Sequence, residues 1–195
     1  MRKMKTITVY CASSSKIAPL YTASARELGH LMAAKNVACI NGAGNRGLMG
    51  ALSDAILESG GKVTGIIPRF MVEEKWFHPR LSEMIVVDDM HERKRLMAEK
   101  SDGCIALPGG TGTMEELLEI ITWKQLGLYM HPVVILNING YYDDLLRMFE
   151  KASRENFMHP HHQHIYRLAA SPEEAISIIE EHRLWIKDPR SIASL

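Results

Sequence analysis

Apolar runs rich in β-branched residues alternate with longer segments of helical periodicity along this chain of 195 residues, and each run ends in small or polar residues. Few architectures accommodate that alternation, which is typical of βαβ units. We expect strands at Thr6–Cys11, Val37–Asn41, Lys62–Ile67, Met84–Val87, Gly103–Leu107 and Val133–Leu136. Most of these runs are continuously hydrophobic, as in parallel strands covered on both faces. The sequence therefore predicts a Rossmann-like, doubly wound parallel sheet with helices on both faces, as a single domain over residues 1–195.

Helical periodicity predicts the connecting elements. We expect helices at Leu20–Ala34, Leu48–Glu58, Met90–Lys100, Thr113–Leu126 and Tyr142–Glu155. A last helix is predicted from Ser171 to His182, with Ser171 as N-cap, Pro172 at the first helical position and Glu174 closing a capping box. Gly60, Gly61 and Gly127 stand where helix C-caps belong.

Charge and cysteine content exclude several classes of protein. The 23 basic and 23 acidic residues give zero formal charge, so no long-range field attracts a nucleic-acid polymer or an anionic membrane. Cys11, Cys39 and Cys104 lie in apolar runs without CxxC or CxH spacing, so we expect buried thiols and neither disulfides nor a zinc site. The beginning, MRKMKTITVYCASSS, has too short an apolar run for a signal peptide or membrane span. These features fit a cytoplasmic protein.

A sheet of this type binds ligands at the carboxyl ends of its strands. After the first predicted strand, Ser13 and Ser14 offer hydroxyl groups to phosphate or ribose, although an ordinary polar loop has the same composition. After the second, Gly42, Gly44 and Gly47 fit the GxGxxG pattern. The acidic residue that NAD-binding proteins carry at the end of the next strand is absent, because that strand ends in GIIPRF. A mononucleotide phosphate is therefore a better candidate ligand than NAD.

The loop after the fifth predicted strand, PGGTGTMEEL, precedes a helix. Its glycines permit close approach of the backbone, and the amides at the helix start form a nest for an anion. No GK[ST] follows, which excludes a Walker A motif. Glu115 and Glu116 would repel a bound phosphate unless one of them has another task. The alternative is that both only complement the helix dipole, at ~0.3–1 kcal/mol each.

Two cations lie near another predicted helix start, in MHERKRLMAEK. The helix dipole disfavours Arg93 and Lys94 there, so a bound anion or carboxylate explains their position better than a solvated face.

Together these motifs resemble the LOG (Lonely guy) family of cytokinin-activating enzymes, whose bacterial members were long labelled lysine decarboxylases. Its hallmark PGGxGTxxE is matched at Pro108–Glu116, and its Arg-Lys pair, MHxRK, at Met90–Lys94. The resemblance continues through GLMG, GIIP, SDGCIALPGG, ITWKQLG and NINGYYDDLL, to about Glu155. The second-strand loop departs from the family's GGGxxGLMG at Ala43.

The resemblance implies a phosphoribohydrolase, in which water cleaves the N-glycosidic bond of AMP or an N6-modified purine nucleoside 5′-monophosphate. It implies catalysis by Arg93 and Glu116, without a metal or other cofactor. Members of this length resemble the dimeric class, so we expect a homodimer, with the helices at Met90–Lys100 and Thr113–Leu126 as candidate interface. Together with the loops above, the expected substrate-binding residues are Ser13, Ser14, Gly42, Gly44, Gly47, Met49, Lys94, Gly109, Gly110, Thr111, Gly112, Thr113, Glu115 and Thr122.

Two segments have more than one interpretation. Trp76 and Phe77 can stack on a base, pack in the core or form a dimer contact. The run His159–His164, HPHHQH, fits a surface turn, with a metal site formed by two of its histidines as the alternative.

Two other functions compete with hydrolysis. Lysine decarboxylation requires pyridoxal phosphate on a Schiff-base lysine, and no lysine here stands in a recognisable context for it. A non-catalytic nucleotide-binding or carrier protein of the same fold would keep the glycine loops, but it need not keep Arg93 and Glu116.

Overall fold

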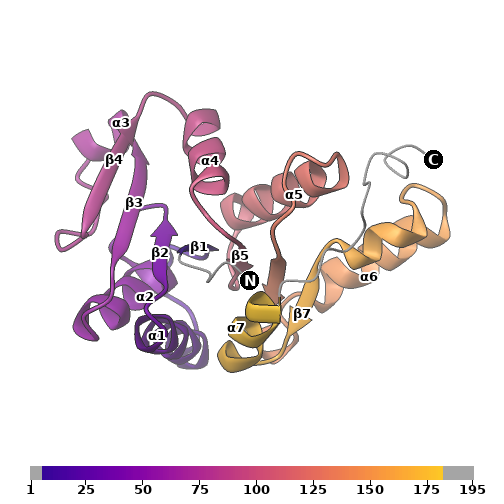
Figure 1. Cartoon of the computed structure of the whole chain (residues 1–195), viewed down its shortest axis with the longest axis horizontal. Coiled ribbons are helices and arrows are strands. Elements are labelled where there is room, and N and C mark those ends of the chain that lie inside the picture. The colour runs from indigo at the N-terminus through magenta and orange to yellow at the C-terminus, as the bar shows by residue number, and fades with distance from the viewer. Residues whose placement is uncertain (1–5, 182–195) are drawn as a thin grey trace.

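The computed structural model describes residues 6–181 and contains one seven-stranded parallel sheet (Figure 1). The predicted domain's two ends and His182 of the last predicted helix lie outside the described residues. The sheet order is β4-β3-β2-β1-β5-β6-β7, and every adjacent pair is parallel. The predicted doubly wound α/β fold is confirmed. Its strands are β1 (Thr6–Tyr10), β2 (Ala38–Asn41), β3 (Val63–Pro68), β4 (Glu83–Val87), β5 (Cys104–Ala106), β6 (Val133–Leu136) and β7 (Arg167–Ala169).

Helices cover both faces of the sheet. Two separate apolar clusters form, one under α1, α2 and α7 and the other under α4, α5 and α6. Figure 1 shows α1, α2 and α7 on one side of the strands and α4 and α5 on the other. The helices are α1 (Pro19–Ala34), α2 (Gly47–Glu58), α3 (Arg69–Glu73), α4 (Met90–Glu99), α5 (Thr111–Gln125), α6 (Asp143–Arg154) and α7 (Pro172–Glu181), with short 3₁₀ turns η1 (Ile138–Gly140) and η2 (Pro160–His164).

The predicted helix ends are largely confirmed. Gly60 and Gly127 follow α2 and α5 with φ of +76° and +74°, the left-handed conformation of a C-cap glycine. At α7, the Glu174 N–H donates to Ser171 Oγ, as a capping box requires. The Glu174 carboxylate, however, accepts from the N–H of Ala170, one residue before the expected N-cap.

The order of the strands reverses at β1. The chain builds β2, β3 and β4 outward on one side of β1, and then returns to place β5 on the other side. Tyr10 at the end of β1 is in register with Ala106 at the end of β5. A doubly wound sheet forms its binding crevice at this switch point. The loops after β1 and β5, both expected to belong to the site, therefore lie side by side.

The three cysteines are free and buried, as expected. Within residues 6–181, no helix combines the length and apolarity needed to cross a bilayer.

Candidate active site

Three loops meet at the carboxyl ends of β1, β2 and β5. The Ala12 N–H donates to the Pro108 carbonyl at 3.2 Å, and the Met49 N–H donates to the Ala12 carbonyl at 3.2 Å. Gly47 adopts a φ of +59°, and a Cβ there would lie 2.5 Å from the Ser14 carbonyl oxygen. The β2 loop is thus packed directly against the β1 loop, which in turn holds the β5 loop.

Arg93 and Glu116 face one another across this end of the sheet. Arg93 Nη2 lies 3.8 Å from Glu116 Oε1. Only 7% of Arg93 and 9% of Glu116 is exposed. Arg93 lies in the first turn of α4 and Glu116 in the second turn of α5, and these helices bring the two residues together from positions far apart in the sequence. The two residues that the family resemblance marked as catalytic are therefore neighbours, while their catalytic role stays a prediction.

Gly42 makes room for the Arg93 guanidinium. A Cβ at Gly42 would lie 1.8 Å from Arg93 Nη2, so any side chain there would displace the guanidinium. Among residues 6–181, Arg93 Nε is buried without a hydrogen-bond partner. Buried donors are normally satisfied, so this unpaired N–H is an exception within the described part of the fold.

The Glu116 carboxyl group titrates near neutrality. Burial raises its pKa from 4.5 to about 7, against the attraction of Arg93, which lowers it. Glu115 adds to the rise by repulsion between like charges. At physiological pH both the ionised and the protonated form of Glu116 are therefore populated.

Lys94 has a different set of partners from Arg93. Its Nζ donates to Glu115 Oε1 at 2.8 Å and lies 3.2 Å from Glu119 Oε1, with the side chain buried. A carboxylate partner for Lys94 was one of the two expectations, and it is confirmed. Glu115, expected to contact substrate, thus has a structural task in holding Lys94. Contact of either residue with a nucleotide stays a prediction.

The start of α5 is open to a ligand. Gly110 is its N-cap, and no described side chain caps it, whereas Asp89 caps α4 through the Glu92 N–H. The first N–H groups of a helix have no partner within the helix. Apart from the adjoining residues and the nearby backbone of α5, no atom of residues 6–181 lies within 4 Å of a Cβ built at Gly110 or Gly112, so space is free there. This is the geometry expected for binding an anion.

Comparison with known proteins gives the family of the chain. A family model described as "Possible lysine decarboxylase" matches residues 49–179. Cytokinin riboside 5'-monophosphate phosphoribohydrolase LOG1 of Arabidopsis thaliana is 42% identical over 92% of this chain and 84% of its own length. The probable phosphoribohydrolase LOGL2 of Oryza sativa subsp. japonica is 42% identical, over 92% of this chain and 74% of its own. The chain belongs to the LOG family.

Solved structures of carrier proteins have the same fold as this LOG chain. The molybdenum cofactor carrier protein of Chlamydomonas reinhardtii has a TM-score of 0.70 and 21% identity, covering 92% of this chain and 98% of its own. The molybdenum cofactor binding protein of Rippkaea orientalis has a TM-score of 0.69 and 24% identity, covering 93% and 98%. At these identities the likeness concerns the fold alone.

Two backbone N–H groups in the β2 loop of this LOG chain form hydrogen bonds with nearby side chains of the same chain segment. The Gly44 N–H donates to Met49 Sδ at 2.9 Å, so the two expected substrate contacts bind each other. The Ala43 N–H donates to Asn41 Oδ1 at 2.9 Å. Ala43 has a φ of +69°, at the position where the family usually has glycine. The GxGxxG pattern here serves to pack the loop and Arg93, and phosphate contacts by Gly42, Gly44 and Gly47 stay predictions.

Other expected residues lie at the edge of the site or away from it. Ser13 and Ser14 are exposed in the β1 loop, and Thr113 is buried in the first turn of α5. Thr122 is exposed and donates to the Leu118 carbonyl. It lies about 9 Å further along α5 than Glu116, on another side of the helix. Within one chain, the structure therefore does not bring Thr122 to Glu116.

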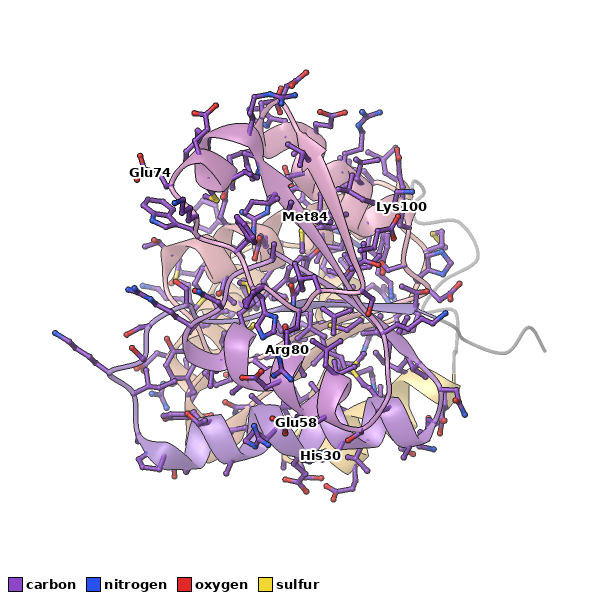
Figure 2. The ribbon with its side chains drawn as sticks, turned by 90° about the vertical axis from the view of Figure 1, so that its left-hand side faces the viewer. His30, Glu58, Glu74, Arg80, Met84 and Lys100 are labelled. Carbon is purple, nitrogen blue, oxygen red and sulfur yellow. The ribbon has the colours of Figure 1, made fainter. Side chains whose placement is uncertain are left out.

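The segment between α3 and β4 is attached to the site by His78, which the sequence did not reveal. The buried His78 donates its backbone N–H to the Ala43 carbonyl at 2.7 Å, and its Nε2 lies 3.1 Å from Asp54 Oδ1. Arg80 also pairs with Asp54 and points toward α2 (Figure 2). Trp76 in this segment is 55% exposed, which excludes core packing, while base stacking and a dimer contact stay predictions.

The run His159–His164 lies mostly at the surface and forms a turn, as expected. It forms η2, with His162 buried. His159 Nδ1 and His162 Nδ1 each accept from a backbone N–H of the same turn. Within residues 6–181, no group of three or more His, Cys, Asp or Glu side chains is arranged to hold a metal ion.

Tyr142 holds the residue that follows β5 through a hydrogen bond. Its buried hydroxyl donates to the Leu107 carbonyl at 2.6 Å. We expect Tyr142→Phe to lower the free energy of unfolding by about 1–3 kcal/mol, because the buried carbonyl would lose its donor. Urea denaturation measures this, with the partly exposed Tyr21→Phe as control. Equal stability of both variants would contradict the assignment.

Proposed function

We propose that this chain is a phosphoribohydrolase that cleaves the N-glycosidic bond of purine nucleoside 5′-monophosphates, AMP or its N6-modified forms, to free base and ribose 5-phosphate. The observation that carries the proposal is the buried Arg93–Glu116 pair beside an uncapped helix start. Relatives at about 42% identity, named as phosphoribohydrolases, support it.

The two halves of the site suit the two ends of such a substrate. The amides at the start of α5 would hold the phosphate, with the helix dipole favouring its negative charge. Departure of the base leaves positive charge on the ribose, as in other glycosidic cleavages. The ionised Glu116 would stabilise that charge or orient the attacking water, and Arg93 would hold ribose or phosphate oxygens. An acidic residue beside an anion site is thereby explained, because one end of the substrate is negative and the other becomes positive.

The pH dependence of the reaction follows from Glu116. Because the pKa of Glu116 is raised to about 7, the fraction of Glu116 in the carboxylate form increases as the pH rises through neutrality. We expect kcat/KM for AMP to rise from pH 5.5 and to level off above about pH 8. The substrate phosphate has its own pKa near 6, so kcat at saturating AMP is recorded alongside. A kcat that stays flat between pH 6 and 8 would contradict the proposed use of the carboxylate.

The test of the activity itself is release of base. The protein is incubated with AMP and with isopentenyladenosine monophosphate, and the free bases are separated by chromatography. Hydrolysis predicts base from at least one of the two, whereas no base from either would refute it in favour of a nucleotide-binding or carrier protein.

Lysine decarboxylation is poorly supported by the lysines near the site. Burial alone would lower the pKa of Lys94, but its hydrogen bonds to Glu115 and Glu119 raise it above the usual value. A lysine held in this charged form is a poor Schiff-base nucleophile.

For assembly we propose a homodimer. Exposed leucines continue along and beyond one side of α5, at Leu118, Leu126 and Leu128, with Thr122 between them. A partner packed on this surface would bury them. For location we propose the cytoplasm, supported by three free thiols, which a reducing compartment maintains.

A further inference from the structure

Three successive carbonyl groups at the end of β5 are each held by a hydrogen bond from another element. The Leu107 carbonyl accepts from the Tyr142 hydroxyl at 2.6 Å, the Pro108 carbonyl from the Ala12 N–H at 3.2 Å, and the Gly109 carbonyl from the Tyr141 hydroxyl at 2.7 Å. A loop rich in glycine has many accessible backbone conformations. These three bonds select one of them.

Holding a carbonyl also fixes the next amide. All peptide bonds of the described residues are trans, so the N–H of Gly110 points opposite to the Gly109 carbonyl. Because Tyr141 holds that carbonyl on its own side, the Gly110 N–H is turned away from Tyr141. Apart from its adjoining residues, a Cβ at Gly110 would meet no atom of residues 6–181 within 4 Å, so the space beside this residue is open.

Tyr141 is itself held in place. Its ring packs edge to face against Tyr21 at 5.9 Å and against Tyr142 at 5.1 Å between centroids. The turn η1, in which Asn139 and Gly140 have positive φ, brings the chain back from β6 toward the β5 loop. The adjacent Asn137 accepts from the Tyr142 N–H and donates to Asp143. The hydroxyl of Tyr141 is therefore presented to Gly109 by a rigid support.

We propose that Tyr141 is a positioning residue for the phosphate end of the substrate. It acts through the Gly109 carbonyl, by keeping the Gly110 amide turned toward the anion at the start of α5. This inference rests on the proposed function for the identity of the anion, a ribose 5-phosphate group. Without the Tyr141 hydroxyl, the peptide between Gly109 and Gly110 is free to rotate, and the site must order it again on each binding event.

The test is Tyr141→Phe, which keeps the ring and its packing against Tyr21 and Tyr142. The dissociation constant for ribose 5-phosphate is measured by calorimetry, and kcat and KM are measured with AMP. We expect the dissociation constant and KM to rise together about three- to tenfold, as for loss of one hydrogen bond, with kcat within about twofold. Tyr21→Phe, which alters the neighbouring ring but no bond to the loop, is the matched control and should leave all three unchanged.

Other outcomes overturn the inference. If Tyr141→Phe lowers kcat and leaves the dissociation constant unchanged, the hydroxyl acts on the chemical step and does not position the phosphate. If all three constants stay at their original values, or if the unaltered protein does not bind ribose 5-phosphate, the positioning role is wrong. Binding is measured without turnover, so a protein that binds ribose 5-phosphate but releases no base refutes the hydrolase and leaves the test of Tyr141 valid.

Discussion

Glu116→Gln should lower kcat for base release by about 10²–10⁴-fold, because glutamine can neither carry the negative charge that stabilises the ribose nor accept a proton from water. Glu116 is buried, and its Oε1 lies 3.8 Å from Arg93 Nη2. Bulk water therefore cannot easily take over the role of the lost carboxylate. Steady-state release of base from AMP measures the effect. Glu99→Gln, at the exposed end of α4, is the control and should retain activity.

The same substitution should make the protein more stable at high pH. The pKa of Glu116 is raised by burial to about 7 in the folded protein, so the folded state favours the protonated form. Stability from this group is fully present below its unfolded pKa, near 4.5, and is lost as the pH rises through 7. Glutamine imitates the protonated form. We therefore expect Glu116→Gln to raise the free energy of unfolding at pH 8, by up to about 3 kcal/mol, and to change it little at pH 4.

Loss of activity together with a gain in stability would separate catalysis from folding. A variant that is inactive and also unfolds more easily at pH 8 would contradict the electrostatic account of Glu116. Full activity would refute its assigned role in the reaction.

Gly42→Ala should lower kcat/KM about 100-fold while the fold survives. The added methyl group would lie 1.8 Å from Arg93 Nη2, and the atom that must give way is the end of a flexible side chain, not backbone. The Arg93 guanidinium would therefore leave its present position opposite Glu116, and displacement of a catalytic group by about 1 Å commonly costs that factor in rate.

The matched control is Gly103→Ala, just before β5. A Cβ there has an ordinary contact of 3.4 Å with Pro132, so activity and stability should change little. Circular dichroism and urea denaturation show whether Gly42→Ala is folded. Normal activity in the folded Gly42→Ala protein would mean that the position of Arg93 does not matter.

The fold could be predicted from the sequence because its signals are local. Continuous apolar runs marked six strands, and Gly60 and Gly127 marked helix ends through their own conformation. The missed strand β7 has three residues, of which only Ala169 is buried, so it carries no detectable pattern. Its pairing with β6 supplies the stability that its own sequence does not indicate.

The contacts within the candidate site could not be predicted from the sequence. Arg93 and Glu116 were found through the family motifs, and their proximity agrees with that choice. A carboxylate partner for Lys94 was expected, but the sequence did not indicate that Glu115 supplies it, that Gly42 makes room for Arg93, or that Tyr141 holds Gly109. Each of these contacts joins residues far apart in the chain, so it depends on how the helices and loops pack.

The most direct test of the two-part site is a crystal structure of the Glu116→Gln protein with bound AMP. We predict the phosphate on the amides at Gly110–Thr113 and the anomeric carbon of the ribose in van der Waals contact with the side chain at position 116, with Arg93 bonded to ribose or phosphate oxygens. A phosphate bound at the β2 loop, or a glycosidic bond turned away from Arg93 and residue 116, would contradict the account.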